Sequence, residues 1–206
     1  LSRLEEVLVH VHLQAGDPLF DEGEEARKIF TITSGTLKLY KLLPDGRRQI
    51  IGFLFGGDFV GLADIDNNVC SAEAVTETTL CGFQRNKFTA LMKEFPKMET
   101  RLLGMARTEL GKAQEQMLLL GRKTAIERMS SFLLMLLKRT SGSSGSSNRV
   151  PIPMSRNDIG DYLGLTTETV SRTLTRLKTA GVITDTTDHR TLGVDVYALQ
   201  DIADGF

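Results

Sequence analysis

The sequence predicts an α+β fold: an N-terminal β-roll, then a long helix, then a small C-terminal domain of short helices and a hairpin. Three observations predict it. Short runs of β-forming residues recur between glycines over residues 1–95. A heptad pattern of apolar residues begins near Pro96. Two short amphipathic segments flank Gly164. We therefore divide the chain into regions 1–95, 96–121 and 122–206.

The composition is that of an ordinary soluble globular protein. The 206 residues are 41% hydrophobic and 25% charged, and a formal net charge of −1 excludes a strongly basic nucleic-acid binder. No uncharged apolar run is long enough for a transmembrane helix, and no secretory signal opens the chain. Two cysteines fit a reducing compartment, so we expect a cytoplasmic protein with no membrane partner. The chain starts at Leu1 and not at Met, which is consistent with further residues upstream.

The first region is expected to form an antiparallel roll or jelly-roll barrel. Its β-forming runs alternate with glycine-containing turns and recur at intervals of about 8–12 residues, which is typical of such folds. Asp45-Gly46 lies between two of the runs and predicts a hairpin. The runs cover residues 9–13, 29–33, 36–42, 49–54, 69–75 and 79–83.

The middle region predicts one helix over residues 97–121 with a narrow apolar stripe. The stripe consists of Leu103, Ala106, Leu110, Ala113, Met117 and Leu120. Its alternating spacing of three and four residues is that of a coiled-coil seam. Two interpretations stay open: the stripe packs on the chain's own roll, or it pairs with a second copy in a homodimer. A second helix over 125–139 has a core-facing apolar face, and the Ser/Gly-rich segment 140–148 is expected to be a surface loop.

The most specific pattern lies at residues 155–181, where a glycine-containing turn separates two short helices. Ser155 and Thr166 are expected to be the N-caps, Gly164 to end the first helix and Gly181 to follow the second. This is the pattern of a helix-turn-helix. Residues 182–184 and 193–196 flank a polar turn and predict a hairpin, which makes the region a winged helix-turn-helix. At the hairpin tip, His189 and Arg190 are placed either to contact phosphate or to point into solvent.

The second of these helices exposes polar side chains opposite its apolar stripe. They are Thr167, Glu168, Ser171, Arg172, Thr175 and Arg176. Arginine suits guanine, a carboxylate suits the cytosine amino group and hydroxyls suit phosphate, so double-stranded DNA is the expected partner. Glu168 and Arg172 are also spaced for an ordinary ion pair on a helix surface.

The roll, long helix and winged helix-turn-helix together resemble the Crp/Fnr family of bacterial transcription regulators over essentially the whole chain. Glu168-Thr-Val-Ser171-Arg172 matches the Glu-x-x-Ser-Arg pattern of the Fnr branch, whereas Thr167 stands where the Crp branch has Arg. The resemblance implies a double-stranded β-helix roll of the cyclic-nucleotide-binding kind and a dimerisation helix. It also implies that Glu168, Ser171 and Arg172 read a TTGAT-type half-site, and that a homodimer reads an inverted repeat.

Further properties follow from the same resemblance. Fnr-type proteins are transcription activators of genes for oxygen limitation, and the turn 43–48 would lie in a loop that contacts RNA polymerase. Cyclic-AMP-binding members carry Gly-Glu-Leu and a later Arg-Ser or Arg-Thr. Here the corresponding stretches are Gly61-Leu62-Ala63 and Cys70-Ser71. A buried phosphate without its cation is unfavourable, so we expect no cyclic nucleotide.

Cys81 resembles in position the internal cysteine that ligates the oxygen-sensitive 4Fe–4S cluster of Fnr proteins. Such a cluster needs roughly four thiolates, and the other three ligands would have to lie upstream of Leu1 because this chain has two cysteines. Alternatively, Cys81 is a small buried side chain in a FixK-like regulator without a cluster, or Cys70 or Cys81 is a reactive thiol.

The sequence carries no enzyme signature. Glycine-rich phosphate loops, the Gly-x-Ser-x-Gly motif and the His-Glu-x-x-His motif do not occur. His10 and His12 would begin the metal site of a cupin-like barrel enzyme, but the third histidine, His189, lies in another region. We therefore expect a DNA-binding regulator and not an enzyme.

Overall fold

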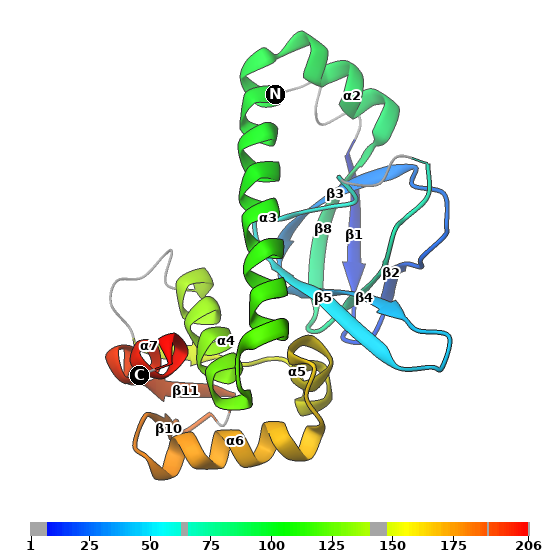
Figure 1. Ribbon diagram of the computed structural model, residues 1–206. Helices are drawn as coiled ribbons and strands as arrows, with labels where there is room; N and C mark the ends of the chain where they lie inside the picture. The colour runs from blue at the N-terminus through cyan, green and yellow to red at the C-terminus, as the bar shows by residue number, and fades with distance from the viewer. Residues whose placement is uncertain (1–7, 63–65, 141–147, 189, 206) are drawn as a thin grey trace. The chain divides into compact units, whose positions relative to one another are not determined.

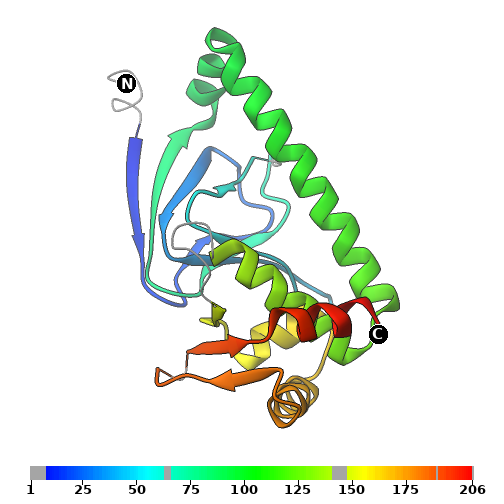
Figure 2. The ribbon, with the colours of Figure 1, turned by 90° about the vertical axis from the view of Figure 1, so that its left-hand side faces the viewer.

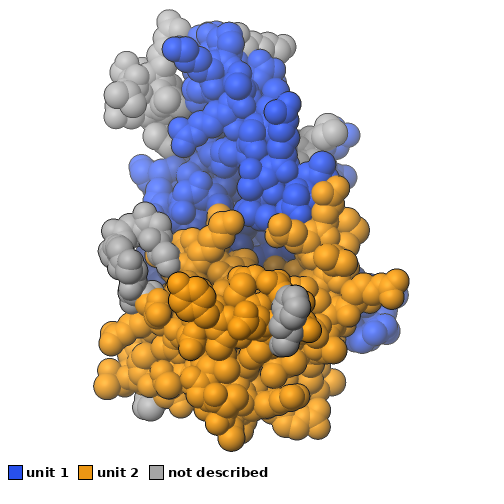
Figure 3. All heavy atoms as spheres, turned by 60° about the vertical axis from the view of Figure 1, so that its left-hand side comes forward, with its two compact units in different colours: residues 1–112 blue, residues 113–206 orange. Residues whose placement is uncertain are grey.

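The computed structural model describes residues 8–62, 66–140, 148–188 and 190–205, and it has the expected α+β architecture (Figure 1). The chain divides into two compact units, residues 1–112 and 113–206, which Figure 3 distinguishes by colour. Three expectations lie outside the described residues: the loop over 141–147, the side chain of Ala63 and the position of His189.

Two four-stranded antiparallel sheets form the roll. One contains, in order, β1 (Leu8–Leu13), β8 (Thr78–Gln84), β3 (Lys28–Ser34) and β6 (Phe59–Val60). The other contains β2 (Pro18–Phe20), β7 (Ser71–Ala74), β4 (Thr36–Leu42) and β5 (Arg48–Phe55). Buried apolar side chains of both sheets form one core cluster, with Ile32 and Leu80 from the first sheet and Leu37 from the second. Burial of this cluster supplies the main favourable free energy of the roll.

Each predicted β-run overlaps one of the longer strands, and the short strands β2 and β6 were not predicted. The Asp45-Gly46 hairpin is confirmed, since β4 and β5 pair antiparallel and the Gly46 N–H donates to the Leu43 carbonyl at 2.9 Å. Gly46 has a φ of 84°, which a residue with a side chain rarely adopts.

The expectation of β structure throughout residues 1–95 is wrong for residues 85–94. These form helix α2 (Arg85–Glu94). Phe88 and Met92 lie four residues apart on one face of α2, and they pack with Ile29 in a second buried cluster. A spacing of four residues places both side chains on one face of a helix, whereas the alternating pattern of a strand would place residues two apart on one face.

The long helix is α3 (Pro96–Arg122), 27 residues in length. Met98 and Leu102 pack on the α2 cluster. The predicted apolar stripe lies on a different face: Leu103, Leu110 and Met117 are 57%, 62% and 66% exposed. These three stripe residues are therefore not covered within the single chain, whereas Leu120 of the stripe is half-buried.

The C-terminal unit is built around α4 (Ala125–Thr140), which packs against α6, α7 and β9. Phe132, Leu133 and Leu136 of α4 are fully buried. The other elements are β9 (Arg149–Pro151), α5 (Arg156–Leu163), α6 (Thr167–Thr179), β10 (Ile183–Asp185), β11 (Thr191–Val194) and α7 (Val196–Asp204). Figure 2 shows the predicted hairpin of β10 and β11 beside α6. β9, which adds a third strand to this hairpin, and α7 were not predicted.

Both helices of the helix-turn-helix begin at the predicted caps. The Ser155 hydroxyl accepts from the Asp158 N–H at 3.0 Å, and the Ser155 backbone N–H donates to the Asp158 carboxylate at 3.4 Å, which gives a complete capping box for α5. The Ser155 hydroxyl also donates to that carboxylate at 2.7 Å. Thr166 caps α6 by accepting from the Thr169 N–H. Among the described residues, none of the helices is both long and apolar enough to cross a membrane.

Removal of the Ser155 hydroxyl should destabilise the C-terminal unit. Ser155→Ala removes the hydroxyl that accepts from the Asp158 N–H and donates to the buried Asp158 carboxylate, and we expect a loss of about 1–2 kcal/mol in the free energy of unfolding. Urea unfolding followed by circular dichroism measures this loss. Ser171→Ala, at an exposed position inside α6, is the control and should cost nothing; equal stability of both variants would contradict the assigned cap.

Candidate nucleic-acid interface

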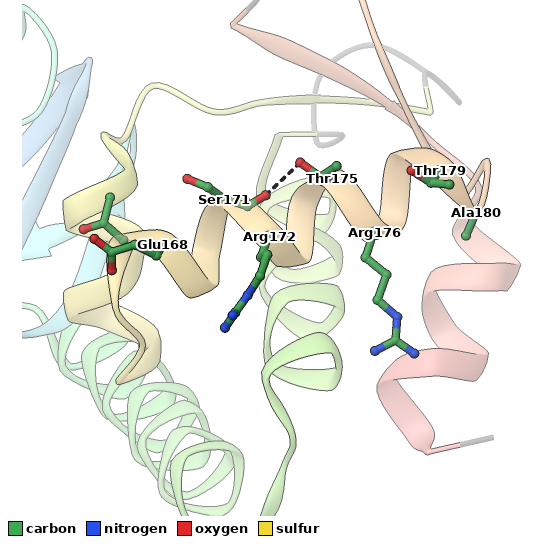
Figure 4. Close-up of a pocket in the computed structure, with 8 residues that line it drawn as sticks. Glu168, Ser171, Arg172, Thr175, Arg176, Thr179 and Ala180 are labelled. Carbon is green, nitrogen blue, oxygen red and sulfur yellow. Dashed lines mark hydrogen bonds between the residues drawn. The ribbon is translucent and has the colours of Figure 1, made fainter.

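The structure brings the six predicted DNA-contacting residues together. All six line one open hollow along α6, together with Thr179 and Ala180 (Figure 4). Five of the six are exposed, and Thr167 is half-buried. Arg172 and Arg176 extend from the same side of α6, and Glu168 lies near its N-terminal end. The hollow is therefore lined by two guanidinium groups, one carboxylate and four hydroxyl groups.

The opposite face of α6 holds this surface in place. Val170, Leu174 and Leu177 are buried in the unit's core and recur with helical spacing. An α-helix with one buried stripe leaves its other side chains facing away from the core. The sequence pattern predicted this division correctly.

Two glycines allow α5 and α6 to approach closely. Gly164 has a left-handed φ of 64° and ends α5. Gly160, which sequence reasoning did not single out, lies where a Cβ atom would come within 2.6 Å of the Leu165 carbonyl oxygen. A side chain at Gly160 would force the turn between the two helices to move.

The electrostatics of the α6 N-terminus keep Glu168 ionised. Its pKa is lowered from the ordinary value by a hydrogen bond from its own backbone N–H and then by the Thr166 hydroxyl, and the positive charge of Arg172 adds to this. The Arg172 guanidinium donates to the Thr169 hydroxyl at 3.3 Å. At neutral pH the hollow therefore offers a hydrogen-bond acceptor at Glu168 and a donor fork at Arg172.

The structure adds polar contacts that sequence reasoning missed. The Thr167 hydroxyl donates to the Asn157 side-chain oxygen at 2.7 Å, which joins the N-terminal ends of α6 and α5. Lys178 pairs with Asp185 at 2.6 Å and so connects α6 to the hairpin. The partners lie ten and seven residues apart and in different elements, so no local motif predicts either pair.

The hairpin tip is ordered by Asp188. Its carboxylate accepts from the hydroxyls of Thr186 and Thr191 and from the backbone N–H groups of Arg190 and Thr191. These hydrogen bonds, with the Thr186 hydroxyl the largest contributor, lower the pKa of Asp188 to about 2. The exposed Arg190 is thus placed at the tip of a well-defined turn.

The roll places Cys81 beside a histidine. Cys81 of β8 lies directly across from His10 of β1, and its Sγ atom is 3.8 Å from His10 Nδ1. Cys70 is buried at 5% exposure, and His12 lies 3.3 Å from the Glu77 carboxylate. The part of the chain that the structure describes contains no cluster of three or more His, Cys, Asp or Glu side chains that could hold a metal ion. These residues alone do not fit a four-thiolate cluster.

The stretches that correspond to a cyclic-nucleotide site are occupied by other contacts. The Arg85 guanidinium donates to the Ala26 carbonyl at 2.6 Å and to the Gly61 carbonyl. The Ser71 hydroxyl accepts from the Glu22 N–H at 2.9 Å. The expectation that no cyclic nucleotide binds stays a prediction.

Comparison with known proteins gives the family. A cyclic nucleotide-binding domain model matches residues 10–95, and a Crp-like helix-turn-helix domain model matches residues 127–202. The nitrogen fixation regulation protein FixK of Bradyrhizobium diazoefficiens is 42% identical over 183 residues, which are 89% of this chain and 77% of that protein. The transcriptional activator FnrL of Cereibacter sphaeroides is 36% identical over 187 residues, 89% of this chain and 75% of that protein.

A solved structure agrees with these matches. FixK2 from Bradyrhizobium japonicum superposes with a TM-score of 0.87 and 35% identity, covering 95% of this chain and 96% of that one. The expected fold class is thereby confirmed. The matched domains and relatives are those of transcription factors, so the chain is a DNA-binding regulator and not an enzyme. It belongs to the Crp/Fnr family of transcription regulators.

Proposed function

We propose that the chain binds DNA as a homodimer and reads an inverted repeat of TTGAT-type half-sites, with α6 in the major groove. The observation that carries the proposal is the gathering of all six polar α6 side chains in one exposed hollow. The major groove admits an α-helix, and each base pair presents a distinct set of donors and acceptors there.

The chemistry of the hollow suits the single G·C pair of such a half-site. Arg172 has the fork of donors that guanine O6 and N7 accept, and the ionised Glu168 accepts from the amino group of the paired cytosine. Both residues lie on one face of α6, one helical turn apart. The hydroxyls of Thr167, Ser171 and Thr175, together with Arg176, are suited to phosphate and to the remaining bases.

The exposed stripe of α3 supports the homodimer. Leu103, Leu110 and Met117 recur every seven residues and are more than half exposed in the single chain. Around Gly104 and Gly111 there is open space where a side chain would be. A second copy of α3 packed in parallel would bury the stripe as a coiled-coil seam and bring two recognition helices to one duplex.

The resemblance to the Fnr branch is the basis for proposing oxygen limitation as the signal and RNA polymerase as the protein partner. We infer a role as an activator of genes for oxygen limitation, with RNA polymerase contacted through the turn 43–48. Leu42 and Leu43 beside this turn are 62% and 41% exposed, which suits a protein contact. A 4Fe–4S cluster is compatible with Cys81 only if further cysteines precede Leu1.

A second candidate is thiol regulation at Cys81, which the neighbouring His10 favours. The Cys81 Sγ atom lies 3.8 Å from His10 Nδ1, within reach of a sulfur hydrogen bond. In this candidate the cysteine attacks a hydroperoxide as the thiolate: a sulfur–oxygen bond forms, the peroxide O–O bond breaks, and the sulfur is oxidised to a sulfenic acid. The other oxygen takes up a proton and leaves as water or an alcohol.

Arg172→Ala should weaken the preference for the inverted repeat over scrambled DNA. We expect a loss of about 1–3 kcal/mol per half-site on the inverted repeat, since a bidentate guanine contact is removed, and little change on scrambled DNA. Fluorescence anisotropy with both duplexes at fixed salt measures this. Arg101→Ala, an exposed arginine on α3, is the matched control. Full preference for the repeat in Arg172→Ala would refute the assignment.

Leu110→Lys should prevent dimerisation. In the proposed dimer each subunit loses a leucine that the seam would bury, and two lysines would face each other. The association constant of the dimer should therefore fall by at least roughly a hundredfold. Sedimentation equilibrium gives the constant. Leu118→Lys changes an equally exposed leucine that lies off the stripe, at 59% exposure, and should dimerise as the wild type does. If both variants behave alike, the stripe is not the seam.

Peroxide treatment separates the two candidates for Cys81. Thiol regulation predicts that peroxide weakens binding to the inverted repeat by the wild type and Cys70→Ser, and that Cys81→Ser is insensitive. A cluster predicts about four irons per chain after anaerobic purification of the protein with its upstream residues. A peroxide effect that persists in Cys81→Ser would eliminate the thiol candidate.

A further inference from the structure

The Arg128 side chain connects three helices of the C-terminal unit. Arg128 lies in the first turn of α4, and its guanidinium donates to three backbone carbonyls outside this helix. Nη2 donates to Leu120 in the last turn of α3 and Nε to Lys123 just after α3, both at 2.9 Å. Nη1 donates to Leu163, the last residue of α5, at 2.8 Å. One cation therefore holds the ends of α3 and α5 together.

All three hydrogen bonds are donated by the charged Arg128 guanidinium to backbone carbonyls. The last carbonyls of a helix have no partner within the helix and carry partial negative charge. Hydrogen bonds from a charged donor are about twice as strong as those between neutral groups. The planar guanidinium donates in several fixed directions at once, which the single ammonium of lysine cannot reproduce.

The turn of the helix-turn-helix sits directly on this contact. A Cβ atom at Gly164 would lie 3.3 Å from Arg128 Nη1 and 3.4 Å from a methyl carbon of Leu120. Gln116 of α3 makes a parallel connection, because its side-chain amide donates to the Tyr162 carbonyl of α5 at 3.0 Å. Leu120 is also part of the predicted seam, so one residue of the seam contacts the turn of the helix-turn-helix.

The connection continues from α5 to the recognition helix. α5 packs against α6, and the Asn157–Thr167 hydrogen bond joins their N-terminal ends. Arg128 does not line the hollow of α6. Any effect of Arg128 on DNA must therefore pass through the positions of α5 and α6.

We propose that Arg128 is a positioning residue that fixes the recognition helix relative to the C-terminal end of α3, and so sets the half-site spacing that the dimer accepts. The proposal rests on the proposed homodimeric reading of an inverted repeat. With α3 paired along its seam, a rigid link from α3 to α6 fixes the distance and rotation between two recognition helices. Without the link, each helix-turn-helix adjusts independently.

The test uses the full chain and Arg128→Lys, which keeps the charge but loses the three-way fork. Binding is measured on a single half-site, on an inverted repeat with half-site centres about 10 base pairs apart, and on repeats with one base pair added or removed. We expect Arg128→Lys to bind the best repeat at least about tenfold more weakly than the wild type. Its preference among spacings should shrink to within about threefold, while its half-site affinity stays unchanged.

Other outcomes separate the possibilities. Arg122→Lys, an exposed arginine at the end of α3, should keep the wild-type spacing profile. Gln116→Met removes only the hydrogen bond between α3 and the Tyr162 carbonyl. It should also reduce the preference among half-site spacings, and it replaces Arg128→Lys in the test if that variant does not fold. Equal loss on all duplexes, or an unchanged spacing profile in both variants, overturns the proposal. A wild type that prefers no inverted repeat overturns the proposed function and this inference with it.

Discussion

A single helix, α3, carries two apolar faces, and one chain covers only one of them. Met98 and Leu102 pack on the core that α2 forms with the roll, whereas the stripe through Leu103, Leu110 and Met117 stays exposed. Apolar surface of this extent on a helix drives association. This second face is the surface that the proposed homodimer would bury.

The recognition surface depends on polar contacts that fix its charges before DNA arrives. Thr166 caps α6 and favours the ionised form of Glu168, and Thr169 accepts from Arg172. A donor fork and an acceptor held in a fixed relation lose little conformational entropy on binding. The ion pair between Lys178 and Asp185 connects the hairpin to α6. In the proposed dimer, the side chains of α6 determine which bases are read. The distance and rotation between the two copies of α6 would depend on α3 and on its contacts with α5.

Local signals in the sequence predicted much of the fold and the site. The caps Ser155 and Thr166, the glycine turn at Gly164 and the heptad spacing in α3 each act within a few residues, so they are readable in one chain. The contacts that were missed join different elements: Arg128 with Leu163, Thr167 with Asn157, and Cys81 with His10. Helix α2 was missed because a single ten-residue segment inside a β-rich region gives only a short periodic signal.

Selection of DNA from a pool of random duplexes by the full chain tests the central claim most directly. The account predicts enrichment of two TTGAT-type half-sites in inverted orientation, with centres about one helical turn apart. The inverted orientation would show that two recognition helices act together, and the half-site sequence would show what α6 reads. Enrichment of a single half-site, of direct repeats or of no common sequence would contradict it.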